Sequence, residues 1–402
     1  MPKKILIDGR FIGVGDSISR VTLGILAHLL EIDKNHQYFL LIRPAGIKLV
    51  KEYGFWEKDN LTVKILDIPH YSFEEQTKLL IWLNKRPFDL VFFTQFNHPV
   101  MYKRPYIVVI HDMTTFGYFH YQNPLKVAMF KKVMKSAVFE SKKIITISEA
   151  SKKEIVDYYE VAKSKIKVAH LGIDENYLRI SKLDAGARRR LGQKFKNEFR
   201  IENDYLLYTG MWKKHKNLKR LLQAFEKVSD QLSVVGSKNY KLQTTNLQLV
   251  LIGKIDRNER EIIEEIERIN GHEIDKIQNE DPVFVTGFLA EELLPAAYAG
   301  ALAYVTPSLN EGFGLPPLEA MACGAPVVAA NISATPEILG KAAEYFDPYN
   351  VADIAEKIIE VISNFHLRLD LQKKGFERVK KYFWEKCAKE TLGVINEVIG
   401  SK

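Results

Sequence analysis

Residues 301–331 read ALAYVTPSLNEGFGLPPLEAMACGAPVVAAN, with an apolar run at each end of a loop and short helix rich in glycine and proline. Each apolar run predicts a buried strand. Pro316 and Pro317 suit the first positions of a helix, because the N–H groups that they lack would have no partner there. Gly324 suits the residue that follows the end of this helix. The stretch therefore predicts a strand, a loop, a short helix and a second strand.

Two carboxylates, Glu311 and Glu319, flank this loop with seven residues between them. We expect the backbone N–H groups of Phe313, Gly314 and Leu315 to point out of the mouth of the helix, where a phosphate can bind. Glu319 is expected in the first turn, where the helix dipole favours an ionised carboxylate. A carboxylate can accept two hydrogen bonds at once, which fits the vicinal hydroxyls of a ribose or another sugar. Together these features predict a nucleotide-sugar site.

The stretch resembles the family-4 retaining glycosyltransferases of the GT-B fold, whose hallmark is a pair of glutamates separated by seven residues. The resemblance extends to four flanking segments, VTGF at 285–288, EELL at 291–294, YAGA at 298–301 and SATPE at 333–337. It implies an α/β fold with two Rossmann-like, doubly wound domains that face each other across a cleft. It also implies a C-terminal helix that crosses back to the N-terminal domain.

The alternation of strand and helix patterns supports two domains with parallel sheets. A chain of 402 residues is also too long for one ordinary core. We expect an N-terminal acceptor domain at 1–180, a C-terminal nucleotide-sugar donor domain at 181–380, and the crossing helix at 381–402. The charged stretch 181–203 is interpreted as a linker with a polar helix.

Composition excludes several classes of protein. No apolar run approaches the roughly 20 residues that span a bilayer, and residues 1–8 resemble a strand and not a signal peptide. Cys323 and Cys387 provide neither a disulfide framework nor the spacing of a metal site. We therefore expect a cytoplasmic protein with reduced cysteines.

The net charge is +8, and residues 126–170 carry eleven lysines against five acidic residues. Basic patches attract anionic lipid, phosphorylated substrates or nucleic acid. This segment gives the hypothesis of peripheral contact with an anionic membrane, or of binding to a pyrophosphate-linked acceptor. A solvated helix face is the alternative. No nucleic acid partner is expected, because the donor-site pattern is intact.

The loop at 208–218 resembles the phosphate-side loop of the family, in which a lysine before Asn or Gly contacts the donor pyrophosphate. Lys216 matches that lysine, and Gly210 and Lys213 are expected to help to bind the donor. Met211 stands where many relatives carry an arginine. Lys213 or Lys214 could supply the second positive charge.

Three further candidates lie in the N-terminal half. His111 follows a predicted strand, where ligands gather in open sheets, and the family places at the equivalent position a histidine that touches the donor sugar. His98 is a weaker candidate on the acceptor side. The loop containing Gly13 and Gly15 lacks the third glycine of a dinucleotide fingerprint, which argues against NAD. In the family this loop lies near the donor phosphates, so Gly15 and Arg20 are donor-binding candidates, although the glycines could serve the turn alone.

The resemblance implies a retaining hexosyltransferase that moves a sugar from a nucleoside diphosphate sugar to a hydroxyl of a carbohydrate or lipid-linked saccharide. The expected setting is polysaccharide or glycolipid assembly. Glu311 would bind the donor sugar, Glu319 the ribose, and the loop from Gly312 the sugar or phosphate. Lys216 would neutralise charge on the leaving diphosphate, with His111 as the third catalytic candidate. No Asp-x-Asp stands at a strand end, so neither a metal nor a further cofactor is expected.

Two alternatives remain. A GT-B nucleotide-sugar epimerase could use the same carboxylates as acid and base. A non-catalytic basic binding protein would use the lysine-rich segment.

Overall fold

The computed structural model describes residues 2–14, 17–114, 123–235 and 247–400, and the chain divides into two compact units. The first unit comprises Met1–Gly172 and Phe383–Lys402, and the second comprises Ile173–Tyr382. The sequence placed these boundaries at 180 and 380. Helix α6 (Glu175–Ser181) belongs to the second unit, because the buried ring of Tyr177 packs edge-on against Tyr298, with 6.1 Å between the ring centroids.

The described part of the first unit contains a seven-stranded sheet in the order β3-β2-β1-β4-β5-β6-β7. All of its strand pairs are parallel. Its strands are β1 (Lys4–Asp8), β2 (Gln37–Ile42), β3 (Leu61–Ile65), β4 (Leu90–Phe93), β5 (Tyr106–Val109), β6 (Lys143–Thr146) and β7 (Ile166–Val168).

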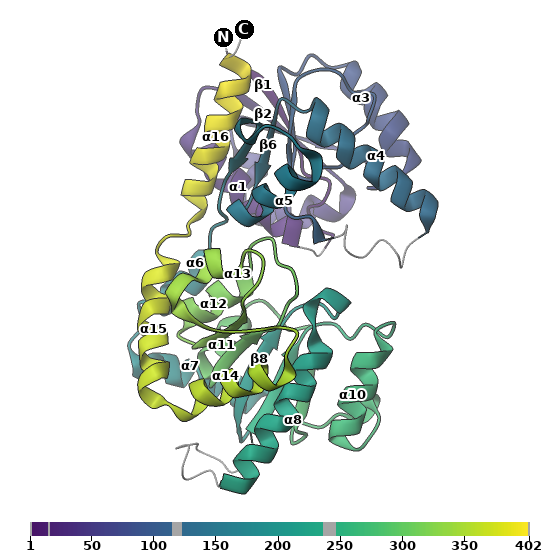
Figure 1. Ribbon diagram of the computed structural model, residues 1–402. Coiled ribbons are helices and arrows are strands. Elements are labelled where there is room, and N and C mark those ends of the chain that lie inside the picture. The colour runs from purple at the N-terminus through teal and green to yellow at the C-terminus, as the bar shows by residue number, and fades with distance from the viewer. Residues whose placement is uncertain (1, 15–16, 115–122, 236–246, 401–402) are drawn as a thin grey trace. The chain divides into compact units, whose positions relative to one another are not determined.

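Helices cover both faces of this sheet (Figure 1). One apolar cluster joins strand residues with helices that include α4 and α5, and α16 packs with α1 and with strands β4 and β6. The helices are α1 (Ser17–Ile32), α2 (Ile47–Glu52), α3 (Leu80–Asn84), α4 (Pro124–Glu140), α5 (Glu149–Tyr159) and α16 (Trp384–Gly400).

The second unit contains, among its described residues, a six-stranded parallel sheet in the order β10-β9-β8-β11-β12-β13. Its strands are β8 (Asp204–Thr209), β9 (Leu247–Ile252), β10 (Val283–Gly287), β11 (Ala303–Thr306), β12 (Val327–Ala330) and β13 (Ala343–Phe346).

Alternation along β8 assigns the helices of this unit to the two faces of the sheet. Leu206 belongs to the core shared with α8, α10 and α14. The preceding Tyr205 donates from its hydroxyl to the carbonyl of Ala297 on α11 at 2.6 Å. Its ring contacts that of Phe195 on α7 in a tilted arrangement, with 5.7 Å between the centroids. Besides α6, the helices described in this unit are α7 (Ala185–Glu198), α8 (Leu218–Val235), α10 (Arg260–Asn270), α11 (Leu294–Gly300), α12 (Leu315–Cys323), α13 (Thr335–Leu339), α14 (Val351–Ser363) and α15 (Phe365–Val379).

The predicted fold class, two doubly wound α/β units with parallel sheets, is confirmed. The sequence missed β7 and β13, both short strands at sheet edges. Helix α16 lies on the first unit, as the crossing helix was expected to do. In the described ranges no helix combines the length and the apolar character needed to cross a bilayer.

Trp384, the first residue of α16, packs closely against two glycines of the first unit. A Cβ built at Gly24 of α1 would lie 2.6 Å from the ring of Trp384, and one at Gly172 would lie 2.2 Å from the Trp384 backbone nitrogen. Trp384 itself is 4% exposed. The absent glycine side chains therefore make the close packing of α16 possible.

Replacing Trp384 with alanine should destabilise the first unit by about 3–5 kcal/mol, because a large cavity would remain between α1 and α16. Thermal unfolding followed by circular dichroism measures the effect as a lower midpoint. Phe383→Ala is the matched control, because Phe383 is 42% exposed and should change stability by less than about 1 kcal/mol. Equal effects of the two substitutions would contradict this account of how α16 is held.

Candidate active site

Two loops at the carboxyl edge of the second sheet are joined by hydrogen bonds. One follows β8, the other follows β11, and these strands are neighbours in the sheet. The N–H of Leu309 donates to the carbonyl of His215 at 2.7 Å. Asn217, in the left-handed conformation at φ 59°, donates from its side chain to the carbonyls of Pro307 at 3.1 Å and Pro348 at 2.8 Å. The β8 loop is thus held against the β11 loop.

Lys216 and Glu311 form an ion pair across these loops. The Lys216 Nζ donates to Glu311 Oε1 at 2.7 Å, and the two side chains are 19% and 20% exposed. Although burial by itself would raise the pKa of Glu311, the Lys216 ammonium and hydrogen bonds from Lys216 and Ser308 bring it below its ordinary value. The carboxylate is therefore ionised at neutral pH, and a cationic donor lies beside it.

The glycine loop supplies backbone donors next to this pair. Gly314 adopts φ 90° and precedes the first residue of α12, Leu315. The N–H groups of Gly312, Gly314 and Leu315 have no acceptor among the residues that the structure describes. Such N–H groups at a helix start favour an anion. Phe313 is 3% exposed, and its side chain therefore belongs to the core.

Glu319 lies one residue further along α12 than the sequence predicted. Because α12 begins at Leu315, one residue before Pro316, Glu319 is the fifth residue of the helix, and the prediction of a first-turn position is wrong. The dipole effect falls off within the first turn, and a side-chain donor is present instead. The hydroxyl of Tyr298 donates to Glu319 Oε2 at 3.0 Å. Glu319 is only 2% exposed.

A network of hydroxyl groups connects Glu319 to the end of β8. Thr209 Oγ1 lies 3.0 Å from the hydroxyl of Tyr298 and 3.2 Å from that of Tyr304. Burial raises the pKa of both tyrosines well above the ordinary value, so they remain neutral donors. This network was not predicted from the sequence, although the YAGA segment containing Tyr298 contributed to the resemblance.

The other residues predicted on the β8 loop have separate environments. Gly210 adopts φ 149°, and a Cβ there would lie 2.9 Å from the Tyr208 hydroxyl, so a side chain is excluded on two grounds. Lys213 Nζ pairs with Asp256 Oδ2 at 2.6 Å. Met211 is 60% exposed. The structure thus brings Lys216, but not Lys213, into an ion pair with Glu311.

The remaining candidates lie in the first unit. His111 follows β5 and is half-buried, with its Nε2 3.1 Å from the carbonyl oxygen of Thr94. Arg20 lies half-buried on α1, and Gly15 falls outside the described residues. The hypothesis that His98 contacts an acceptor is wrong, because His98 is fully buried. Burial lowers the pKa of His98 to about 4, so it stays neutral within the core.

The loop after β1 is organised by Arg10, which the sequence analysis passed over. Arg10 is fully buried and donates to both oxygens of Asp8 at 2.8 Å and to Glu75 Oε1 at 2.7 Å. Burial alone would lower the pKa of Arg10, but the two carboxylates raise it above its ordinary value. Gly13 adopts φ 85°, and a Cβ at this position would lie 2.2 Å from the Ala45 carbonyl oxygen. The turn therefore requires glycine here.

No group of three or more His, Cys, Asp or Glu side chains is placed to hold a metal ion in the described ranges. The residues that the structure brings together at one place are Lys216, Glu311 and the N–H groups of the glycine loop. This arrangement can bind an anionic group and accept hydrogen bonds from hydroxyls beside it.

Two family models match consecutive parts of the chain. Residues 190–378 match "Glycosyl transferases group 1", and residues 19–177 match "Glycosyltransferase Family 4". The chain carries both domains of a GT-B glycosyltransferase.

Several curated relatives of this glycosyltransferase are named as mannosyltransferases. The chain is 27% identical over 286 residues to O-antigen chain mannosyltransferase B of Escherichia coli, covering 71% of this chain and 68% of that protein. It is 25% identical over 255 residues to O-antigen chain mannosyltransferase RfbU of Salmonella typhimurium, covering 63% and 59%. It spans about a quarter of the Escherichia coli serotype-specific mannosyltransferase WbdA (27% identity over 61% of this chain and 27% of that protein).

Solved structures have the same fold. Anabaena HepE in complex with UDP-glucose superimposes with a TM-score of 0.72 at 15% identity, covering 98% of this chain and 99% of that one. A glycosyltransferase from Rickettsia africae gives a TM-score of 0.69 at 15% identity over the full length of both chains. These likenesses support the GT-B fold of the glycosyltransferase.

Lys216→Met should raise the pKa of Glu311 and destabilise the second unit by about 1–3 kcal/mol at pH 7, because a half-buried carboxylate would lose its partner. The pKa of Glu311 is lower in the native state than in the unfolded state. The ion pair therefore stabilises the fold fully above the unfolded-state pKa, and this stabilisation is lost as the pH falls through the native-state pKa. The difference between wild type and variant in unfolding free energy, measured by urea titration, should therefore shrink below about pH 4.

Lys213→Met is the matched control for this substitution. Its pair with Asp256 is more exposed, at 46% for the lysine side chain, and its loss should cost less than about 1 kcal/mol. A pH-independent difference between wild type and Lys216→Met would contradict the coupling of the ion pair to the titration of Glu311.

Proposed function

We propose that this glycosyltransferase moves a hexose from a nucleoside diphosphate sugar to a carbohydrate acceptor during polysaccharide assembly, with retention of the anomeric configuration. The observation that carries the proposal is the Lys216–Glu311 pair beside the N–H groups of Gly312, Gly314 and Leu315. Mannose is the first donor sugar to test, because the curated relatives are named as mannosyltransferases. The same names favour a bacterial surface polysaccharide as the acceptor.

The chemical demand of the reaction is charge that develops on the leaving diphosphate. An ammonium group has three N–H donors, and Lys216 uses one of them for Glu311. The Lys216 ammonium can therefore donate to a phosphate oxygen while Glu311 keeps it in place. The N–H groups of the glycine loop would add neutral donors that need no reorganisation. This charge stabilisation would proceed without a metal ion.

Glu311 would accept hydrogen bonds from the donor sugar, since its carboxylate is ionised and 20% exposed. Glu319 would bind the ribose, because a carboxylate can accept further hydrogen bonds beside the one from Tyr298. The geometry supports Lys216 and Glu311 more directly than it supports the buried Glu319. With no enzyme nucleophile assigned, the acceptor hydroxyl would approach the face that the diphosphate leaves, as the family resemblance implies. His111 is proposed as a third residue that contacts the donor sugar.

Lys216→Ala should lower kcat by about 10²–10³-fold, the usual loss when one preorganised donor is removed. Glu319→Ala should chiefly weaken binding of the nucleotide. Transfer assays with GDP-mannose, UDP-glucose and related donors measure the first effect, and nucleotide-induced shifts in unfolding temperature measure the second. Glu356→Ala on α14 is the control, because Glu356 is exposed. Wild-type kcat in Lys216→Ala would refute its role. Conversion of the donor sugar without an acceptor would favour an epimerase.

We also propose that α4 rests on an anionic membrane surface. Its outward side carries Leu125 at 81% exposed and Met129 at 52% exposed. Lys132 and Lys135 are exposed on the same side, and Lys126 is exposed in the first turn. The opposite side is buried in the core of the first unit. Anionic lipids attract lysines near the membrane surface, and the exposed apolar side chains beside them can enter the headgroup region.

The triple substitution of Lys126, Lys132 and Lys135 by glutamine should reduce the affinity for anionic vesicles by about 100-fold, at roughly 1 kcal/mol per lysine. Co-sedimentation with phosphatidylcholine vesicles, with and without phosphatidylglycerol, measures this. A triple glutamine variant of Lys373, Lys374 and Lys380, all exposed, serves as the charge-matched control. Binding that depends on neither phosphatidylglycerol nor salt would contradict the proposal.

A further inference from the structure

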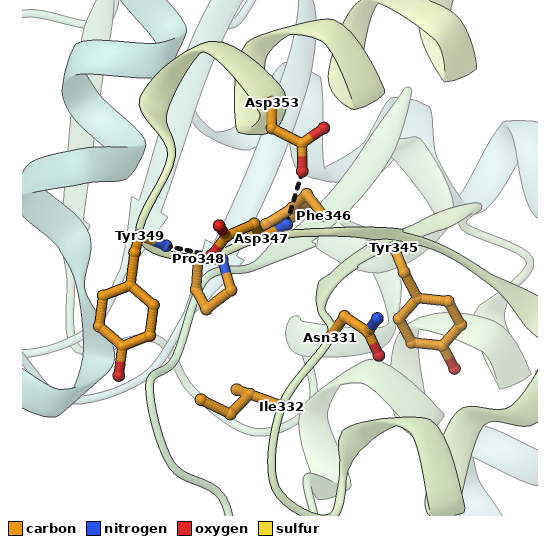
Figure 2. Close-up of a pocket in the computed structure, with 8 residues that line it drawn as sticks. All are labelled: Asn331, Ile332, Tyr345, Phe346, Asp347, Pro348, Tyr349 and Asp353. Carbon is orange, nitrogen blue, oxygen red and sulfur yellow. Dashed lines mark hydrogen bonds between the residues drawn. The ribbon is translucent and has the colours of Figure 1, made fainter.

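A pocket of about 450 Å³ opens at the carboxyl ends of β12 and β13 in the second unit, and the proposed donor site does not use it (Figure 2). Its lining combines aromatic rings with acidic and amide side chains. The lining residues are Asn331, Ile332, Tyr345, Phe346, Asp347, Pro348, Tyr349 and Asp353.

The carboxylates of this pocket keep acceptor capacity. Asp347 Oδ1 accepts from the Tyr349 N–H at 2.9 Å, and Asp353 Oδ2 accepts from the Asp347 N–H at 2.6 Å. The second oxygen of each carboxylate, and the side-chain amide of Asn331, have no hydrogen-bond partner among the described residues. These bonds fix the direction of both carboxylates and leave three polar groups for a ligand.

Two tyrosine rings lie on either side of Pro348 and Asn331 in Figure 2. Tyr349 is 58% exposed, and the Arg220 guanidinium lies 5.6 Å from the centroid of its ring. The hydroxyl of Tyr345 donates to the carbonyl of Gly340 at 2.6 Å, which holds that ring in place. An exposed ring beside polar groups can bury the apolar face of a ligand whose edge is polar.

This combination favours a neutral, hydroxyl-rich ligand over an anion. Asp347 and Asp353 disfavour a phosphate or another anion, because like charges repel. Sugar hydroxyls can donate to the carboxylates and exchange hydrogen bonds with the amide of Asn331. A pocket of this volume is also within the range of sites that bind small molecules.

The pocket shares its loops with the candidate active site. Asn217, next to Lys216, donates to the carbonyl of Pro348 in the pocket lining. Ser333, two residues after Asn331, donates to the carbonyl of Glu311 at 2.9 Å. A ligand in the pocket would therefore lie at the same edge of the sheet as the Lys216–Glu311 pair.

We propose that this pocket is a subsite that binds sugar residues of the acceptor chain away from the residue that is glycosylated. This inference rests on the proposed function, in which the acceptor is a carbohydrate. Tyr349 would stack on a sugar ring, while Asp347, Asp353 and Asn331 would bind its hydroxyls. The subsite would make longer acceptors bind more tightly than short ones and leave the donor site unaffected.

The test compares wild type with Tyr349→Ala, which removes the ring, and Tyr349→Phe, which keeps it. Isothermal titration with α-linked oligosaccharides of mannose, glucose, galactose and rhamnose, from monosaccharide to hexasaccharide, measures binding. Tyr349→Ala should weaken binding of the longest bound oligosaccharide by about tenfold, with a matching rise in KM and unchanged kcat. Tyr349→Phe should stay within about twofold of wild type, because stacking is preserved. Asp353→Asn is a second, charge-neutral variant that keeps an acceptor for the Asp347 N–H.

Nucleotide-induced stabilisation and donor hydrolysis, measured on the same variants, separate the two proposals. In one outcome, every variant retains nucleotide-induced stabilisation and donor hydrolysis while its oligosaccharide affinity equals that of wild type. That result overturns the subsite and leaves the proposed function standing. Absence of binding by any oligosaccharide of the panel at millimolar concentration also overturns the subsite. Calcium binding that Asp353→Asn abolishes, without saccharide binding, would reassign the pocket to a cation. Absence of nucleotide binding and of hydrolysis in wild type would instead overturn the proposed function.

Discussion

The attachment of the β8 loop to the β11 loop is the constraint on which the candidate site depends. The bond from Leu309 to His215 and the two bonds from the Asn217 side chain leave these loops little freedom to separate. An ion pair between partly exposed side chains is weak by itself, because solvent screening and side-chain entropy oppose it. The fixed loops reduce that entropic cost for Lys216 and Glu311. One of these bonds, from the Asn217 side chain to the carbonyl of Pro348, also reaches the lining of the pocket beyond β13.

The sequence was most informative where the chemically important residues and the residues that determine the backbone geometry lie in the same short stretch. Glycines and prolines around Glu311 determine where the loop ends and α12 begins, and these residues are visible in one short stretch. The proximity of Lys216 and Glu311 was also predictable, since parallel strands place their carboxyl ends at one edge. The exact start of α12 was not, and a shift of one residue moved Glu319 out of the first turn.

Other features could not be read from the sequence, because they depend on contacts between distant segments. The hydrogen bond from Tyr298 to Glu319 joins two helices, and the bond from Arg10 to Glu75 joins residues 65 positions apart. His98 was expected on the acceptor side, yet it is buried in the core, where its Nε2 lies within hydrogen-bond distance of the Ser136 and Tyr106 hydroxyls. Periodicity indicates which face of an element is buried, but it does not say which partners meet a polar group there. Buried polar groups require such partners, so each had to be found in three dimensions.

The first unit is assembled from two separated parts of the chain, with α16 completing it through Trp384. During synthesis the ribosome releases residues in order, so the second unit is finished while the first still lacks its last helix. Until then the surface of α1 around Gly24 remains open to solvent or to chaperones. The second unit can fold as soon as Tyr382 has emerged, whereas the first also needs α16.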